Sequence, residues 1–245
     1  MSTEKKIALV TGGNRGVGLE TARELGRKGF ALVIGTRDVG RAEQALASLR
    51  KEGIEVETVL YDARRPDAER TVFDHLSRHY GKLDVLVNNS GVLQEELLTN
   101  TALTVPLATV EDTFAVNLFA VIRLTRALLP LLEKAEAGRI VNVSSVLGSL
   151  TLHSAESSPI APAKAFAYNA SKAALNAFTI HLADALRGTA IKANSVHPGW
   201  VKTELGGPHA TDPIEGSGKT SARLATIEAD GPTGGFFHEE NTLPW

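Results

Sequence analysis

Tyr168 and Lys172 are the side chains whose types and spacing point most directly to proton chemistry. They lie four residues apart in a run of good helix formers, so we expect both on one face of a helix. A phenol titrates near about 10 in water, but a nearby ammonium favours the phenolate and lowers that pKa, which gives a usable acid or base. Alone, such a pair more often marks a half-buried tyrosine beside a solvated lysine.

The second chemical signal is a glycine-rich turn near the start of the chain. The apolar run 6–10 has the length of a buried parallel strand, and the amphipathic helix 16–27 follows it. Gly12 allows a tight turn, Gly16 lets the backbone approach a pyrophosphate, and Gly18 permits close helix–strand packing. The helix N-terminus then offers N–H groups and a positive dipole end to phosphates. The alternative is a glycine-rich turn that binds nothing.

Taken together with four further segments, these two features resemble the short-chain dehydrogenase/reductase family. The glycine turn is similar to T-G-x-x-x-G-x-G, and the dyad is similar to Y-x-x-x-K. The other matching segments are 88–91 (Asn-Asn-Ser-Gly, with Ser90 in place of alanine), Asn117, the strand 138–145 and the P-G-x-x-x-T segment 198–203. A long stretch before Tyr168 and the run 231–237 resemble the carbonyl-reductase-like members.

The resemblance implies a catalytic set of Asn117, Ser145, Tyr168 and Lys172. Tyr168 would exchange the proton with the carbonyl oxygen, while Lys172 would hold the nicotinamide ribose and lower the phenol pKa. Ser145 would stabilise negative charge on the substrate oxygen. Asn117 would anchor a water that relays protons toward Lys172. Ser144 competes with Ser145, and the family pattern favours the second serine.

The resemblance also implies a set of residues that contact the dinucleotide. It draws on the glycine turn, the ends of the second and third strands, the segments 89–91 and 198–203, and the dyad itself. Asp62 would bind the adenine. The members are Thr11, Gly12, Asn14, Arg15, Gly16, Val17, Gly18, Arg37, Asp62, Ala63, Asn89, Ser90, Gly91, Tyr168, Lys172, Pro198, Gly199, Val201 and Thr203.

The end of the second strand favours NADP(H) over NAD(H). An acidic side chain there would bind the ribose 2′-hydroxyl of NAD, whereas a basic one accommodates the 2′-phosphate of NADP. The usual acidic position is Thr36 here, Arg37 follows it, and Arg15 lies in the glycine turn. Guanidinium groups suit a phosphate. Asp38 argues the other way unless it points away and caps the next helix, and both arginines could instead be solvated surface charges.

Strands and helices alternate along the 245 residues, which predicts one α/β domain over 1–245 with a Rossmann-type, doubly wound parallel sheet of about seven strands and helices on both faces. We expect strands at 6–10, 31–35, 55–60, 83–87, 139–144, 190–196 and near 234–237. We expect helices near 16–27, 40–52, 66–79, 109–134, 165–187 and 217–228. The segments 92–108 and 147–164 show no clear period.

Composition narrows the class of protein. A net charge of −2 argues against nucleic acid or an anionic membrane as partner, and the absence of cysteine excludes thiolate chemistry. The start of the chain is charged, and no segment reads as a membrane span, so we expect a cytoplasmic protein. His75 and His79 have the spacing of a metal pair but lack a third ligand nearby, so we expect them on an exposed helix face and predict no metal site.

Two loops should form the walls of a substrate pocket. The segments 151–163 and 206–216 both leave the carboxyl edge of the sheet, where α/β sheets bind ligands. Apolar side chains for the inner surface are Leu147, Leu150, Leu152, Trp200 and Leu205. The first segment could instead be a plain surface loop. By resemblance it could also block the oligomer interface that the Tyr168 helix commonly forms, so a monomer and a homo-oligomer both stay open.

The residues and the family resemblance together thus predict NADPH-dependent reduction of a ketone or aldehyde to an alcohol, which can run in reverse as an alcohol dehydrogenase. The alternative of another class is a non-catalytic dinucleotide sensor with the same fold. A sugar-nucleotide epimerase also fits the dyad but fits the glycine spacing poorly.

Overall fold

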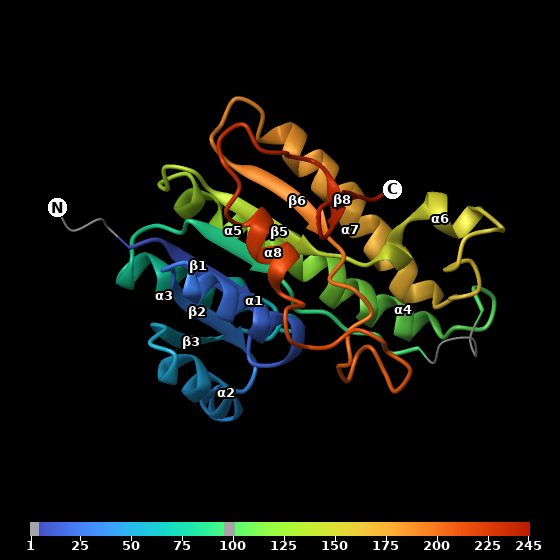
Figure 1. Ribbon diagram of the computed structural model, residues 1–245, viewed down its shortest axis with the longest axis horizontal. Helices are drawn as coiled ribbons and strands as arrows, with labels where there is room; N and C mark the ends of the chain where they lie inside the picture. The colour runs from blue at the N-terminus through green and yellow to red at the C-terminus, as the bar shows by residue number, and fades with distance from the viewer. Residues whose placement is uncertain (1–4, 96–100) are drawn as a thin grey trace.

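The computed structural model describes residues 5–95 and 101–245. In this part of the chain, eight strands form one sheet in the order β3-β2-β1-β4-β5-β6-β7-β8 (Figure 1). Every neighbouring pair is parallel except β7 and β8. The strands are β1 Ile7–Thr11, β2 Ala31–Thr36, β3 Val56–Leu60, β4 Val85–Asn88, β5 Arg139–Val143, β6 Lys192–Val196, β7 Phe236–His238 and β8 Asn241–Thr242.

The expected strands are all present, within two residues at each end. The Rossmann-type α/β fold is therefore confirmed, with one strand more than predicted. The extra strand, β8, is two residues long, too short to show an alternating pattern.

The helices cover both faces of the sheet. They are α1 Gly16–Arg27, α2 Val39–Lys51, α3 Ala68–His79, α4 Leu107–Phe114, the π-helix η1 Ala115–Phe119, α5 Ala120–Leu132, the 3₁₀-helix η2 Val146–Gly148, α6 Leu150–Ser154, α7 Phe166–Ala185 and α8 Lys219–Leu224. The last of these is shorter than the expected 217–228, and α6 interrupts a segment that we expected to be irregular. The other segment that we expected to be irregular is 92–108, and its residues 96–100 lie outside the residues that the structure describes.

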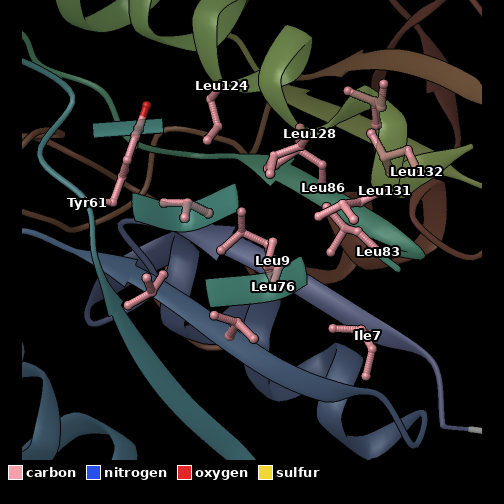
Figure 2. Close-up of a cluster of buried hydrophobic side chains, with 14 of the residues drawn as sticks. Ile7, Leu9, Tyr61, Leu76, Leu83, Leu86, Leu124, Leu128, Leu131 and Leu132 are labelled. Carbon is pink, nitrogen blue, oxygen red and sulfur yellow. The ribbon is translucent and has the colours of Figure 1, made fainter. Parts of the chain in front are cut away.

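Two buried clusters hold the layers together. On one face, α1, α2 and α8 pack against the sheet through residues such as Leu25, Leu46 and Leu224. Figure 2 shows the other face, where leucines of α5 meet Leu9 and Leu86 from the central strands. Strands buried on both faces are uniformly apolar, which is why their positions follow from the sequence.

One helical stretch is apolar enough to resemble a membrane span, although we expected no such segment. Within the described residues, Leu107–Leu132 is long and apolar enough to cross a membrane by length and composition. In the structure, 56% of its most apolar window is buried. Packing against the sheet and α7 therefore accounts for its apolar character.

His75 lies in a different environment from the one expected. It is half-buried, with its Nε2 2.6 Å from Glu57 Oε1, and its ring lies 4.6 Å from the ring of the exposed His79. The Tyr80 hydroxyl donates to the same Glu57 oxygen. Among the described residues, no group of three His, Cys, Asp or Glu side chains could hold a metal ion.

His197, which follows β6, makes stability depend on pH. Its Nδ1 is buried without a partner among the described residues, and its ring lies 4.8 Å from that of His238. Burial, then the charge of His238, lowers the pKa of His197 to about 4. Between about pH 6.5 and pH 4 only the unfolded imidazole binds a proton, so the stability present above that window is lost as the pH falls through it.

We therefore expect the chain to lose about 1–3 kcal/mol of its free energy of unfolding through His197 between pH 7 and pH 4. Urea denaturation across that range measures this loss, and His197→Gln should reduce it. The control is His181→Gln on the exposed face of α7, which should leave the loss unchanged. An equal loss in the parent and in His197→Gln would contradict the assignment.

Candidate active site

The candidate site lies at the carboxyl ends of the central strands. β1 and β4 are neighbours, but β1 connects onward to β2 on one side while β4 connects to β5 on the other. The chain thus leaves the two adjacent strand ends in opposite directions, which opens a crevice where α/β sheets bind ligands. The glycine turn, the segment 89–95 and α7 meet around this crevice.

The glycine turn fits a dinucleotide phosphate. Gly16 has a φ of +52°, and a Cβ on Gly18 would lie 2.5 Å from the Gly12 carbonyl oxygen, so neither position accepts a side chain without strain. α1 begins at Gly16, and its N-cap residue, Arg15, makes no side-chain capping bond. The first-turn N–H groups of α1 are thus left for a ligand, as an anion site requires.

The segment after β4 is tied to this turn. Thr11 Oγ1 accepts hydrogen bonds at 3.0 Å from the backbone N–H groups of Asn89 and Ser90. Asn89 Nδ2 donates to the Thr11 carbonyl oxygen at 2.9 Å. Gly91 comes next, and a Cβ built on it would lie 3.5 Å from Lys172 Nζ. The predicted cofactor residues 89–91 therefore connect the glycine turn to the dyad.

Tyr168 and Lys172 lie on α7, and both are buried. Lys172 Nζ is 5.7 Å from the centre of the Tyr168 ring and donates to the Val143 carbonyl oxygen at 2.7 Å. Burial lowers the pKa of Lys172 to about 8 and raises the pKa of Tyr168 to about 12. We expected Lys172 to lower the pKa of the phenol, but in the structure that pKa is raised. Desolvation of the buried phenol is the larger effect, and the group that lowers the pKa is Ser145 rather than Lys172.

The two serines after β5 have different surroundings. Ser145 lies beside the Tyr168 phenol and lowers its pKa, and Ser145 Oγ accepts from the Leu147 N–H at 3.2 Å. The Ser144 hydroxyl instead faces the Lys172 carbonyl oxygen, 3.4 Å away, and is buried. Of the two, Ser145 is therefore the serine placed beside the phenol.

Asn117 is buried in the π-helix η1, a local widening that is frequent at functional sites. Its Oδ1 accepts from the Val92 N–H at 2.8 Å, and its Nδ2 donates to the Val92 carbonyl oxygen and to Ser171 Oγ, both at 3.0 Å. The side chain thus clamps the segment after β4 to α7. The predicted water relay through Asn117 stays a prediction.

The residues that would read the adenosine half lie at the ends of β2 and β3. Asp38 does cap the next helix, because its Oδ1 accepts from the Arg41 N–H at 2.9 Å. Arg37 is exposed immediately before it, and Arg15 is exposed and paired with Glu204. Asp62 Oδ1 accepts from the Arg64 N–H at 3.1 Å, and Ala63 is buried.

The segment 198–203 packs over the glycine turn. A Cβ on Gly16 would lie 2.9 Å from Thr203 Cγ2, so Thr203 touches that turn. Asp212, from the loop that follows, accepts from the Trp200 N–H at 2.7 Å and pairs with the buried Val201. Pro198 and Gly199 are half-buried beside them.

The two predicted wall segments leave the expected edge of the sheet. In Figure 1, α6 lies toward the right-hand end of the molecule, and the orange stretch after β6 lies below its centre. Leu147 and Leu152 are half-buried, while Leu150, Trp200 and Leu205 are largely exposed. Whether these side chains line a substrate pocket stays a prediction.

Sequence reasoning missed Glu95 and Asp212. Glu95 is buried on the segment after β4, and its Oε2 accepts from the Tyr168 N–H at 2.9 Å. The two residues are 73 positions apart, so no local pattern pairs them. Asp212 follows the second wall segment's Gly-Pro stretch and likewise carries no motif.

Comparison with known proteins agrees with this arrangement. A family model for short chain dehydrogenases matches residues 6–213. Human carbonyl reductase [NADPH] 1 is 31% identical over 283 aligned positions that cover the whole of both chains. The 3-oxoacyl-[acyl-carrier-protein] reductase of Pseudomonas aeruginosa is 35% identical and aligns with 84% of this chain and 77% of its own length.

A solved structure of NADPH-bound carbonyl reductase from chicken fatty liver superposes with a TM-score of 0.85 at 26% identity, covering 99% of this chain and 100% of that one. The sequence motifs, the fold and the family match therefore support the same assignment. The chain belongs to the short-chain dehydrogenase/reductase family of oxidoreductases.

Proposed function

We propose that this protein uses NADPH to reduce a ketone or aldehyde to an alcohol, and that it runs in reverse as an alcohol dehydrogenase. The observation that carries the proposal is the buried Tyr168 phenol, which lies beside Ser145 and one helical turn from the buried Lys172. This group lies next to a glycine turn with the features of a phosphate site. Relatives named carbonyl reductase [NADPH] support the same chemistry.

When bound, the nicotinamide supplies the hydride. The chain's own task is to orient the substrate carbonyl and deliver one proton. The Ser145 hydroxyl would donate a hydrogen bond to the substrate oxygen and stabilise its growing negative charge. Tyr168, whose raised pKa keeps the phenol protonated at neutral pH, would give that oxygen its proton. Lys172 would stabilise the phenolate left behind and hold the ribose hydroxyls.

The choice of NADPH rests on Arg37 and Arg15. Both are exposed at strand ends that border the crevice, and β1 and β2 are neighbours in the sheet. Asp38, the acidic residue that would favour a ribose 2′-hydroxyl, has its carboxylate occupied by the Arg41 N–H. This charge distribution suits the 2′-phosphate.

The test is a panel of ketones, aldehydes, quinones and keto esters, with NADPH oxidation followed by absorbance and NADPH binding measured separately. Turnover of at least one carbonyl class supports the proposal. Tight NADPH binding without turnover of any member of the panel would overturn it in favour of a dinucleotide sensor.

Substrate choice should depend on the two wall segments. We expect Leu152→Ala and Leu205→Ala to change the ranking of ketones by kcat/KM, because each removes apolar surface from a proposed wall. KM for NADPH should change less than about twofold, since neither residue belongs to the cofactor set. A fixed ranking together with a lower melting temperature would mean that these leucines serve packing alone.

A further inference from the structure

Glu95 stands out because it is a buried carboxylate bonded to the backbone of the candidate catalytic tyrosine. The residue is 6% exposed, and its Oε2 accepts from the Tyr168 N–H at 2.9 Å. Its other oxygen, Oε1, is buried with no hydrogen-bond partner in the described part of the chain. Burying a half-paired carboxylate is costly, so the contact that it does make must offset that cost.

α7 needs this contact because its own sequence provides no cap. The N-cap residue is Ala165, which makes no side-chain capping bond, and the first turn contains no acidic residue. The first-turn N–H groups of a helix require outside partners, and a negative charge at that end is favourable. Glu95 supplies both from a segment that is distant in sequence. The N–H that it binds belongs to Tyr168 itself, the third residue of α7.

The segment that carries Glu95 is anchored on both other parts of the site. Asn89 is bonded to the glycine turn, and the backbone of Val92 is bonded to Asn117. Glu95 is thus the third fixed point of a short loop that runs from the phosphate turn to the first turn of α7. Because the loop is fixed at Asn89 and Val92, the position of Glu95, and with it the first turn of α7, depends on the glycine turn and on Asn117.

We propose that Glu95 is a positioning residue for Tyr168: its carboxylate holds the first turn of α7 through the Tyr168 N–H and so fixes the phenol against Ser145. The inference rests on the proposed function only for its kinetic consequence. Misplacing a reacting group by about 1 Å can cost on the order of 10²-fold in rate. The charge adds to the interaction with the helix end, but the hydrogen bond itself needs only an acceptor oxygen. A glutamine should therefore largely replace Glu95, and an alanine should not.

The kinetic test compares Glu95→Ala and Glu95→Gln with a matched control. Glu95→Ala should lower kcat roughly ten- to hundredfold while KM for NADPH changes less than about twofold, whereas Glu95→Gln should stay within about threefold of the parent. The control is Asp84→Ala. Asp84 is also a buried carboxylate that accepts a distant backbone N–H, from Ile7 at 2.8 Å, but it lies at the amino ends of the strands. It should lower stability without lowering kcat.

A second readout does not need turnover. The chain has three tyrosines, so ¹⁵N-tyrosine labelling gives a spectrum in which Tyr168→Phe identifies the Tyr168 amide. That amide should exchange its hydrogen faster in Glu95→Ala, remain protected in Glu95→Gln, and be unaffected in Asp84→Ala. This measurement decides the positioning role even if the parent reduces no carbonyl, so a failure of the proposed function is distinguishable from a failure of this inference.

If Glu95→Ala does not fold, Glu95→Asp takes its place, because shortening the side chain by one methylene withdraws the acceptor and should produce the same losses. Two results would overturn the proposal. One is a variant lacking the acceptor that keeps the parent's kcat and Tyr168 amide protection while only its melting temperature falls. The other is a Glu95→Gln variant as impaired as Glu95→Ala, which would mean that the charge is required.

Discussion

Tyr168→Phe should lower kcat/KM for carbonyl reduction by about 10²–10⁴-fold while NADPH still binds. The substitution removes one hydroxyl from a buried ring and leaves the packing of α7 intact. That hydroxyl is the proton donor in the proposed reaction, and Ser145 is placed to hydrogen-bond it. The measurement is kcat/KM for the best substrate of the panel, with the NADPH dissociation constant from fluorescence titration.

Tyr80→Phe is the matched control for this prediction. It makes the same chemical change at the edge of the sheet, where the Tyr80 hydroxyl donates to Glu57. Its activity should equal that of the parent. Activity of Tyr168→Phe within about tenfold of the parent would be less than the loss expected for a general acid and would refute the assignment.

Arg37→Ala should discriminate between the two nicotinamide cofactors. A charge-assisted hydrogen bond to the 2′-phosphate is worth about 1.5–3 kcal/mol, so KM for NADPH should rise roughly tenfold to over a hundredfold. KM for NADH should stay near its parent value, because NADH has no phosphate at that position. The comparison needs initial rates with both cofactors.

Arg187→Ala serves as the control for charge removal alone, because Arg187 is a highly exposed arginine just after the C-terminus of α7, at the amino ends of the strands. It should leave both constants unchanged. Equal effects of Arg37→Ala on NADPH and NADH would mean that Arg37 does not read the phosphate.

The sequence predicted best those parts of the molecule in which local pattern and chemistry coincide. The turn between β1 and α1 could be read directly, because an apolar strand, spaced glycines and an amphipathic helix are adjacent in the chain. α7 could be placed because its sequence is rich in alanine, the strongest helix former, around the dyad. α6 was missed because five residues are too few for a period, although Ser149, which accepts from the Leu152 N–H, is a recognisable cap.

What could not be predicted depends on burial and on long-range contacts. The pKa of Tyr168 was expected to fall through Lys172, but the structure buries the phenol and raises the pKa. No sequence pattern reports how deeply a side chain is buried. Glu95 was missed for a related reason, because its partner lies 73 residues away. The π-helix at Asn117 is likewise set by packing rather than by local propensity.

The central claim is that this chain transfers hydride from NADPH to a carbonyl carbon while Tyr168 supplies the proton. The most direct measurement uses NADPH with deuterium at either face of nicotinamide C4 and analyses the product alcohol by mass spectrometry. The account predicts deuterium on the carbinol carbon from one of the two labelled cofactors. In Tyr168→Phe the amount of deuterated alcohol should fall almost to zero. Bound NADPH that gives no deuterated alcohol from any carbonyl of the panel would contradict it.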